Sequence, residues 1–280
     1  MMAQWLRAVS TTSLFVVSGL SWFVVQVQPS VVTEAAETEI KVPPYQSPFG
    51  TLLPVSPSEP GNAADEYIQT IRALSRRLDA IGVHDEKDYS KGLPLTPDEL
   101  QGIVKGSKKK DSAFAPTYYP VKRSGLDPEL NIAAIRTIDN GILEQGHKLE
   151  GQGKLDEATH LYESLVTFGW HLKQEKRSLV QHMLGIVTES LGCEALQQLS
   201  TRRGLEEQAR IYGAYRDKEQ ARLKLIAKKH RLIQEDKEFA SRVLQQDEDP
   251  MWRREAVDFV ATHLKAKSAA TTHAEEEKKP

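Results

Sequence analysis

The sequence predicts an all-α protein built from antiparallel helical hairpins with a long C-terminal helix. Between about residues 128 and 265, apolar residues recur at helical spacing, and glycines are the main interruptions. A capping residue followed by proline, which is typical of a helix start, occurs at Thr96-Pro97, Asp127-Pro128 and Asp249-Pro250. Aromatic residues make up 7% of the chain and charged residues 27%, which suits a helical protein with a modest core.

Residues 1–28 carry the features of an export signal. Residues 8–27 contain no charged side chain, Arg7 and the amino terminus precede them, and Glu34 and Glu37 follow. This polarity predicts a cytoplasmic N-terminus and an exported, periplasmic or otherwise extracytoplasmic body. Two interpretations stay open: a signal peptide cleaved after Ala35, and an uncleaved anchor in which residues 8–27 cross the cytoplasmic membrane.

Residues 29–61 form a proline-rich segment that we interpret as a spacer. Half of the chain's 14 prolines stand here, at Pro29, Pro43, Pro44, Pro48, Pro54, Pro57 and Pro60. Proline lacks the backbone N–H donor and fixes φ, so we expect neither helix nor sheet to propagate through this segment. We expect instead an extended and partly disordered connection to the helical body.

Residues 62–125 are expected to hold two helices and a loop. The first helix spans residues 62–81 with an apolar stripe of Tyr67, Ile71, Leu74, Leu78 and Ile81, and Gly82 ends it. A capping box opens the second helix at Thr96-Pro97-Asp98-Glu99, and Gly102 and Gly106 flank its end. Residues 105–125 mix lysines with aromatics, and we interpret them as a solvated connector, with a protein or glycan contact as the alternative. The net charge of −2 and the expected export argue against a nucleic-acid partner.

Residues 126–265 are expected to form the main helical domain. We expect helix breaks near Gly151 to Gly153, Gly169, Gly192, Gly204 and Asp249-Pro250. Residues 205–246 are expected to form one long helix, because apolar pairs recur there at seven-residue steps. A last helix follows Pro250 with Trp252, Ala256 and Phe259 on one face. Residues 266–280 have few apolar side chains and are expected to be a disordered tail.

The stretch from Gly141 to Trp170 predicts two amphipathic helices folded around a glycine turn. Gly146 and Ala158 are the small residues where the helices cross, and Gly153 marks the turn. Leu155 starts the second helix, and Tyr162 supplies an apolar contact. In order and spacing these residues resemble a tetratricopeptide repeat, over about one repeat at residues 139–172. A degenerate second hairpin follows, in which Gly185 and Gly192 echo the first pair at more than the family's usual spacing of about 34 residues.

The resemblance to tetratricopeptide repeats implies a binding surface. In that family the first helix of each hairpin lines a concave face that contacts partner proteins. Carried over to this chain, the partner-binding residues would be Asn140, Leu143, His147 and Glu150. A single repeat cannot bury its apolar face alone, so neighbouring helices must cover it. The alternative is that the chain's own long C-terminal helix fills the concave face.

Two Glu-x-x-His sets suggest a second hypothesis, a helical metalloprotein. Glu144 and His147, and likewise Glu157 and His160, each share one face of a helix. Such pairs hold the metals in four-helix di-iron proteins. However, the repeat-like register places Glu157 and His160 on the outer side of their helix. We therefore expect no metal ligands and no cofactor.

The sequence favours a scaffold over an enzyme. It contains no Gly-x-Ser-x-Gly elbow, phosphate-binding loop, Rossmann glycine set or His-Glu-x-x-His motif. Its single cysteine, Cys193, excludes an intrachain disulfide and is expected to be buried. We expect an exported helical scaffold that contacts protein partners in the cell envelope and the membrane through its N-terminal segment. A self-assembling structural component, and hence a homo-oligomer, is the remaining alternative.

Overall fold

The computed structural model describes residues 40–43, 47–54, 56–82, 93–114, 131–174 and 179–261. The chain divides into two compact units, Met1–Lys41 and Val42–Pro280, and the helices and strands found in the described residues belong to the second. The expected membrane segment at residues 8–27 and the expected tail at residues 266–280 lie outside the described residues. Among the residues that are described, no helix has the length and apolar content needed to cross a membrane.

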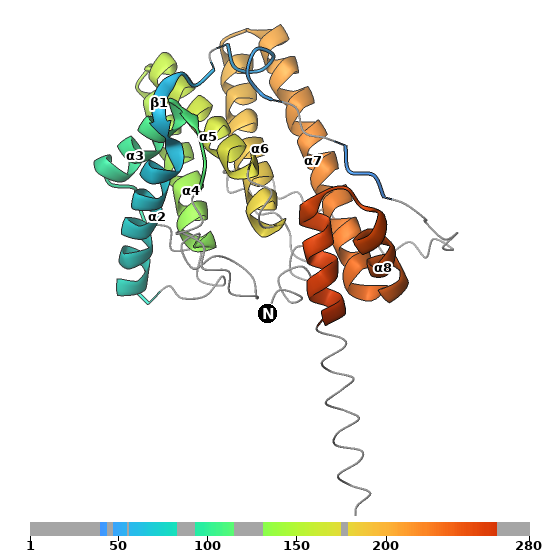
Figure 1. The fold of residues 1–280 in the computed structure, drawn as a ribbon. Coiled ribbons are helices and arrows are strands. Elements are labelled where there is room, and N and C mark those ends of the chain that lie inside the picture. The colour runs from blue at the N-terminus through green and yellow to red at the C-terminus, as the bar shows by residue number, and fades with distance from the viewer. Residues whose placement is uncertain are drawn as a thin grey trace, which may run out of the picture. The chain divides into compact units, whose positions relative to one another are not determined.

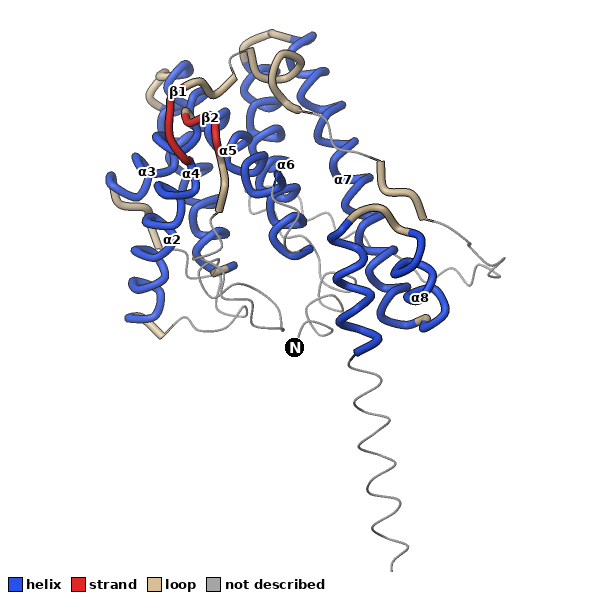
Figure 2. Tube along the Cα trace, viewed as in Figure 1, coloured by secondary structure: helices blue, strands red, loops and turns tan. Residues whose placement is uncertain are grey.

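The described part of the chain is mostly helical, and the all-α prediction is confirmed (Figure 1). Its helices are α2 (Ala63–Ala80), α3 (Pro97–Ser107), α4 (Ile132–Gly151), α5 (Leu155–Gln174), α6 (Leu179–Arg202), α7 (Glu206–Glu235) and α8 (Lys237–Gln246). Helical residues 250–261 follow α8. Two short strands, β1 (Glu59–Asn62) and β2 (Lys109–Asp111), pair in parallel among the helices (Figure 2).

Helices α5 and α6 form the centre of this unit. Helix α5 packs against α4, α6 and α3, while α6 also packs against α7. Helix α2 contacts α3 and α4, and α8 lies on α7. Most residues of α5 and α6 are buried, so the core runs along these two helices.

Helices α2 and α3 begin as the sequence predicts. Asn62 caps α2 by accepting a hydrogen bond from Ala64 N at 3.2 Å. The capping box of α3 is complete, because Glu99 N donates to Thr96 Oγ1 at 3.3 Å and Thr96 N donates to the Glu99 carboxylate at 2.8 Å. These local hydrogen bonds fix where both helices start.

The glycines of α3 let α2 approach closely. A Cβ on Gly102 would lie 2.2 Å from Thr70 Oγ1, and one on Gly106 would lie 2.3 Å from the Tyr67 ring. Both glycines stand inside α3, which ends one residue after Gly106, close to where the sequence predicts. These two glycines therefore allow close contact between α2 and α3, and they also lie near the C-terminal end of α3.

The proline-rich segment packs onto the helices over part of its length. Leu52 and Leu53 are buried, and Glu59–Asn62 forms β1. The prediction that no helix or strand forms between residues 29 and 61 is therefore wrong at its C-terminal end. Pro60 is compatible with this strand because β1 pairs on one side only, with β2.

The expected connector at residues 105–125 is described as far as Phe114. Helix α3 extends to Ser107, β2 follows, and Phe114 is fully buried. The prediction of a solvated loop is therefore wrong for this aromatic residue. Residues 115–130, which include the expected helix cap at Asp127-Pro128, lie outside the described residues.

Helices α4 and α5 form the predicted hairpin. Asn131 caps α4, since its Oδ1 accepts a hydrogen bond from Ala133 N at 2.9 Å. Gly153 adopts a φ of +76° in the turn, a conformation that favours glycine. A Cβ on Gly146 would lie 2.2 Å from the Tyr162 ring, so the small residue at this crossing makes room for an aromatic side chain.

Helices α5 and α6 approach each other backbone to backbone. A Cβ on Gly169 would lie 2.6 Å from Gly185 O, and one on Gly192 would lie 2.9 Å from Val166 N. The predicted helix breaks at Gly169 and Gly192 are therefore wrong, because both residues lie inside helices. Here glycine is used for close helix packing and not to end a helix.

The expected single helix at residues 205–246 consists of two helices. Helix α7 ends at Glu235, and Asp236 is extended, with φ −120° and ψ 107°. The Asp236 carboxylate accepts hydrogen bonds from Glu238 N at 2.8 Å and Phe239 N at 3.0 Å, which caps α8. The prediction of one helix is wrong because this capping aspartate competes with helix continuation.

The remaining predicted boundaries in this region are confirmed. Gly204 adopts a φ of +71° between α6 and α7. The Asp249 carboxylate accepts a hydrogen bond from Met251 N at 3.0 Å, and helical residues 250–261 follow. The predicted inner face of this last helix is buried, with Trp252 2% and Phe259 7% exposed.

Candidate functional site

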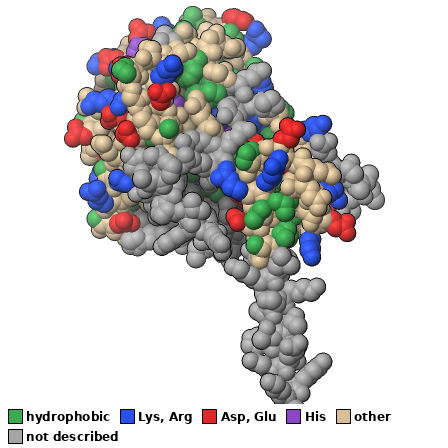
Figure 3. All heavy atoms as spheres, in the orientation of Figure 1, with side chains coloured by type: hydrophobic (Ala, Val, Ile, Leu, Met, Phe, Trp, Pro, Cys, Tyr) green, Lys and Arg blue, Asp and Glu red, His purple; other side chains and the backbone are tan. Residues whose placement is uncertain are grey.

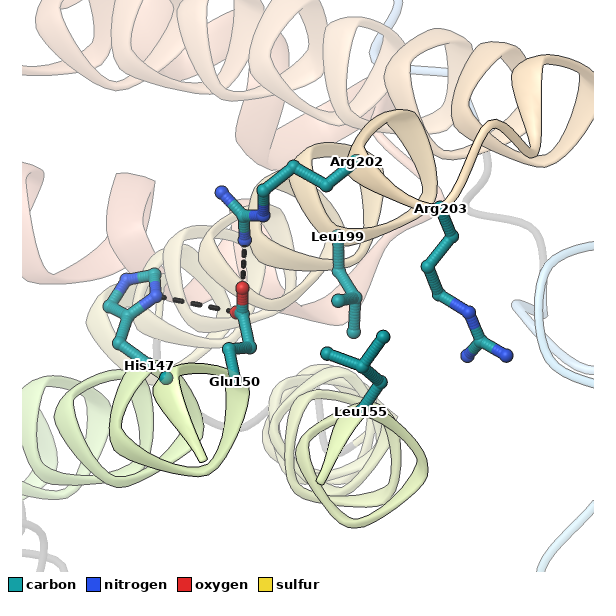
Figure 4. A pocket seen from close by; sticks show the side chains of 7 residues that line it. His147, Glu150, Leu155, Leu199, Arg202 and Arg203 are labelled. Atoms are coloured by element: carbon teal, nitrogen blue, oxygen red, sulfur yellow. Dashed lines mark hydrogen bonds and ion pairs between the residues drawn. The ribbon is translucent and has the colours of Figure 1, made fainter. Parts of the chain in front are cut away.

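A cavity of about 380 Å³ lies at the tips of two helical hairpins, where α4 turns into α5 and α6 turns into α7 (Figure 4). It is lined by the end of α4, the start of α5 and the end of α6, through His147, Glu150, Gly151, Leu155, Leu199, Arg202 and Arg203. Its volume falls within the range of about 300–1,000 Å³ that is typical of ligand sites. We call it the hairpin-tip pocket.

Glu150 is the polar centre of the hairpin-tip pocket. Its carboxylate accepts a hydrogen bond from Tyr162 Oη at 2.5 Å, forms an ion pair with Arg202, and lies 3.4 Å from His147 Nδ1. Glu150 is only 11% exposed, whereas Arg202 and His147 are each 51% exposed. Burial and the hydrogen bond to Glu150 raise the pKa of Tyr162, so its hydroxyl keeps the proton it donates.

A second arginine and two leucines complete the hairpin-tip pocket. Arg203 pairs with Asp156 at 3.2 Å, but Asp156 is 85% exposed, so water screens this ion pair and it contributes little. Leu155 and Leu199 point toward each other between the charged side chains (Figure 4). The pocket therefore combines an apolar wall with a charged rim.

The structure brings together two of the four partner-binding residues that the repeat resemblance implies. His147 and Glu150 line the pocket. Asn140 and Leu143 lie about two turns and one turn before His147 on α4 and are not part of the lining; Asn140 is exposed and Leu143 is half-buried. The repeat-like residue Leu155, expected to start the second helix, also reaches the pocket.

Neither Glu-x-x-His set is assembled into a metal site. His147 faces Glu150 in the pocket, and His160 Nδ1 lies 3.1 Å from Glu163. His160 is 79% exposed and Glu157 is 59% exposed, as the repeat-like register predicts for the outer side of α5. Within the described ranges, no group of three or more His, Cys, Asp or Glu side chains lies close enough together to hold a metal ion.

A second charged group, which we call the buried cluster, lies between α5, α6 and α7. Lys173 Nζ pairs with the Glu189 carboxylate and, at 3.0 Å, with Glu219 Oε2. Arg222 Nη1 donates to Glu219 Oε1 at 2.5 Å, and Arg222 Nε donates to Pro43 O at 3.2 Å. These four charged side chains are at most 3% exposed, so two positive and two negative groups balance inside the core.

The buried cluster is sealed by further hydrogen bonds. Tyr215 Oη donates to Glu189 Oε1 at 2.8 Å, and His182 Nδ1 is bonded to Lys173 O at 3.2 Å. Burial raises the pKa of Glu189 against the opposing effect of Lys173, and burial lowers the pKa of His182 to about 4. A buried and hydrogen-bonded network of this kind fixes how helices fit together; it offers no access to a ligand.

Two other buried polar pairs lie away from the pocket. Thr188 Oγ1 is 3.1 Å from both carboxylate oxygens of Asp139, and burial raises the pKa of Asp139 to about 7. Tyr67 Oη is 2.8 Å from His171 Nδ1, and burial lowers the pKa of His171 to about 4. Each pair joins two helices that are far apart in the sequence, so both pairs belong to the packing of the core.

Sequence reasoning missed the buried cluster and the arginines of the pocket. Residues 179–202 carry apolar side chains on every face, which is typical of a helix buried all round. That pattern implies that Glu189 is buried and needs a cation as a partner, although it does not identify Lys173 as that cation. No local pattern links Arg202 to Glu150, because only the tertiary fold brings the ends of α4 and α6 together.

Comparison of the chain with protein-family models, with curated proteins and with solved structures finds no match. The resemblance to a tetratricopeptide repeat therefore stays a prediction from the sequence.

Proposed function

We propose that the protein is a helical protein–protein interaction module, and that its hairpin-tip pocket receives a segment of a partner protein. The observation that supports this most is the exposure of the pocket's charged side chains. Arg202 and His147 are half exposed around an open cavity, whereas the other ionic network of α5 and α6 is closed to solvent. A concave site with an apolar wall and a few converging polar groups is the usual form of a binding site.

The proposal includes a place for the protein in the cell. The uncharged residues 8–27 act as an export signal or as an anchor in the cytoplasmic membrane. The helical body then acts as a scaffold in the cell envelope, with protein partners and no nucleic acid. Protection of the Pro280 end from protease added to spheroplasts, in which the outer face of the cytoplasmic membrane is accessible, would contradict the exported orientation.

Self-association is a second candidate function, and the exposed apolar residues of the C-terminal helices favour it. Leu244 in α8 is 36% exposed and Val257 is 45% exposed. Figure 3 shows hydrophobic side chains gathered over these helices, near the point where the described chain ends. Sedimentation of the full chain over a concentration range separates the two candidates, since a monomer at all concentrations would exclude self-association.

A selection of displayed random peptides tests the proposed function. The full chain is immobilised, and enriched peptides are then tested against the variants Arg202→Gln and Arg210→Gln. Arg210 is a matched control, because it is an exposed arginine in an ion pair with Glu207 on α7, outside the pocket. We expect peptides whose binding is lost with Arg202→Gln and kept with Arg210→Gln. If no peptide distinguishes the two variants, the pocket is not a peptide-binding site.

A further inference from the structure

We infer that the occupant of the hairpin-tip pocket is an acidic peptide segment in which a carboxylate stands beside an apolar side chain. This inference rests on the proposed function and names the chemistry of the partner. The charge, the hydrogen-bond donors, the apolar wall and the size of the pocket all fit such a segment.

The charge of the lining favours an anionic ligand. Arg202 and Arg203 supply two permanent positive charges, and Glu150 supplies one negative charge, so the lining is net positive. The Glu150 charge is shared between Arg202 and the hydroxyl of Tyr162. The attraction for a carboxylate therefore comes chiefly from the solvent-facing side of the two arginines.

The arginines retain donors for a ligand. A guanidinium carries five N–H donors in a planar fork. Arg202 holds Glu150 through Nη2, and Arg203 holds Asp156 through Nη1. The Arg203 pair is weak because Asp156 is highly exposed, so a ligand carboxylate can replace it with little loss. Arginine recognises carboxylates through paired, charge-assisted hydrogen bonds, which are stronger than neutral ones.

The size and the apolar wall favour a peptide over a small inorganic anion. A volume of about 380 Å³ corresponds to about a dozen water molecules at ~30 Å³ each, which exceeds what one ion fills. Leu155 and Leu199 form an apolar surface between the charged groups. A ligand with an apolar side chain next to its carboxylate covers this surface. The removal of both apolar surfaces from water favours binding.

Glu150 makes the hairpin-tip pocket selective. Its carboxylate stays in place because Tyr162 and Arg202 both hold it, so it repels a ligand carboxylate that approaches too deeply. Replacing it by glutamine removes this repulsion and frees Arg202 from its ion pair. The variant Glu150→Gln is therefore expected to bind acidic peptides severalfold more tightly than the unchanged chain.

The test uses the peptides obtained by the selection described above. Each peptide that depends on Arg202 is synthesised twice, once unchanged and once with every Asp and Glu replaced by Asn and Gln. Binding of both forms to the full chain, to Glu150→Gln, to Arg203→Gln and to the control Arg210→Gln is measured by calorimetry at low and high salt. Circular dichroism of each variant confirms that the helical fold is retained.

The inference predicts a defined pattern. The acidic form binds at least about tenfold more tightly than its amide form, since charge-assisted hydrogen bonds are lost in the amide. Its affinity falls with added salt and with Arg203→Gln, rises with Glu150→Gln, and is unchanged in Arg210→Gln.

Two other outcomes overturn the inference and can be told apart. If Arg202-dependent peptides contain no carboxylates, or bind equally well as amides, the ligand chemistry is wrong while the proposed function stands. If the selection yields no Arg202-dependent peptide, the proposed function fails and the inference fails with it.

Discussion

The buried cluster and the hairpin-tip pocket are built from the same chemical groups. In each, a glutamate accepts a hydrogen bond from a tyrosine and pairs with a cation: Glu189 with Tyr215 and Lys173, and Glu150 with Tyr162 and Arg202. They differ in access to water. Lys173 is fully buried, whereas half of the Arg202 side chain is exposed. Exposure, and not residue type, therefore decides which cluster is available to a ligand.

This difference has energetic consequences. Removing one partner from a buried ionic network leaves an uncompensated charge in the core, which is strongly destabilising. Removing one partner from an exposed pair changes the free energy of unfolding little, because water solvates the remaining charge. A substitution in the buried cluster should therefore change mainly the stability of the protein. A substitution in the hairpin-tip pocket should change mainly the binding of a ligand.

Lys173→Met should have the largest effect on stability. It leaves Glu189 and Glu219 buried without their shared cation, and we expect a loss of about 3–5 kcal/mol in the free energy of unfolding. Chemical denaturation monitored by circular dichroism measures it. The matched control is Lys154→Met, since Lys154 is half exposed in its pair with Glu157 and should change stability by less than ~1 kcal/mol. Equal losses in the two variants would contradict the structural role of the buried cluster.

Asp139→Asn should change how stability depends on pH. The pKa of Asp139 is about 7 in the folded protein against 3.8 for the ordinary group, so the folded state keeps a proton that the unfolded chain releases. This group therefore makes the wild-type protein less stable as the pH rises from about 4 to about 7. The asparagine variant lacks this loss. Its free energy of unfolding should therefore rise relative to that of the wild type by about 1.4 kcal/mol per pH unit in that window.

Denaturation of both proteins across the pH range tests this expectation. His171 and His182, whose pKa values are lowered to about 4, give the opposite slope, since their stabilisation increases as the pH rises. They are present in both proteins, so their effect cancels in the comparison. A difference between the two proteins that stays constant from pH 4 to pH 7 would refute the buried, protonated state of Asp139.

Gly169→Ala should have an intermediate effect, because the added Cβ meets the backbone of α6. It would lie 2.6 Å from Gly185 O, and we expect a loss of about 1–3 kcal/mol from overpacking. Gly151→Ala is the control: it stands at the end of α4 with no atom within 4 Å of its Cβ, and it should be neutral or slightly stabilising. Thermal unfolding of the two variants side by side measures the difference, and equal midpoints would rule out the close α5–α6 contact.

Arg202→Gln should have the smallest effect on stability. Glu150 is largely buried, but it keeps the hydrogen bond from Tyr162, and the arginine side of the pair is half exposed, so we expect a loss of about 1 kcal/mol. The same denaturation measurement as for Lys173→Met gives a direct comparison between the two clusters. A loss as large as that of Lys173→Met would mean that the pocket's ion pair holds the fold together.

The sequence predicts the helices better than it predicts how they meet. Local signals placed the caps at Thr96 and Asp249 and the turn at Gly153 correctly, since each depends on a few neighbouring residues. The predicted helix ends at Gly169 and Gly192 are wrong because a glycine needed for helix contact looks the same in sequence as one that ends a helix.

The candidate site was predicted in part, for a related reason. His147 and Glu150 share one helix face and follow from the repeat resemblance, whereas Arg202 and Arg203 reach the pocket only through the tertiary fold. The strand at Glu59–Asn62 was missed because its pairing partner β2 lies far away in sequence. Contacts between distant segments have no local signal, and the two arginines that line the pocket depend on such contacts.

Hydrogen–deuterium exchange of the full chain, with and without a bound acidic peptide from the selection, tests most directly whether the hairpin-tip pocket is the binding site. The account predicts slower exchange at residues 147–156 and 199–206, which surround the pocket. Exchange in the α8 region around Leu244 should be unchanged. Protection confined to the C-terminal helices, with none at the hairpin tips, would contradict the account.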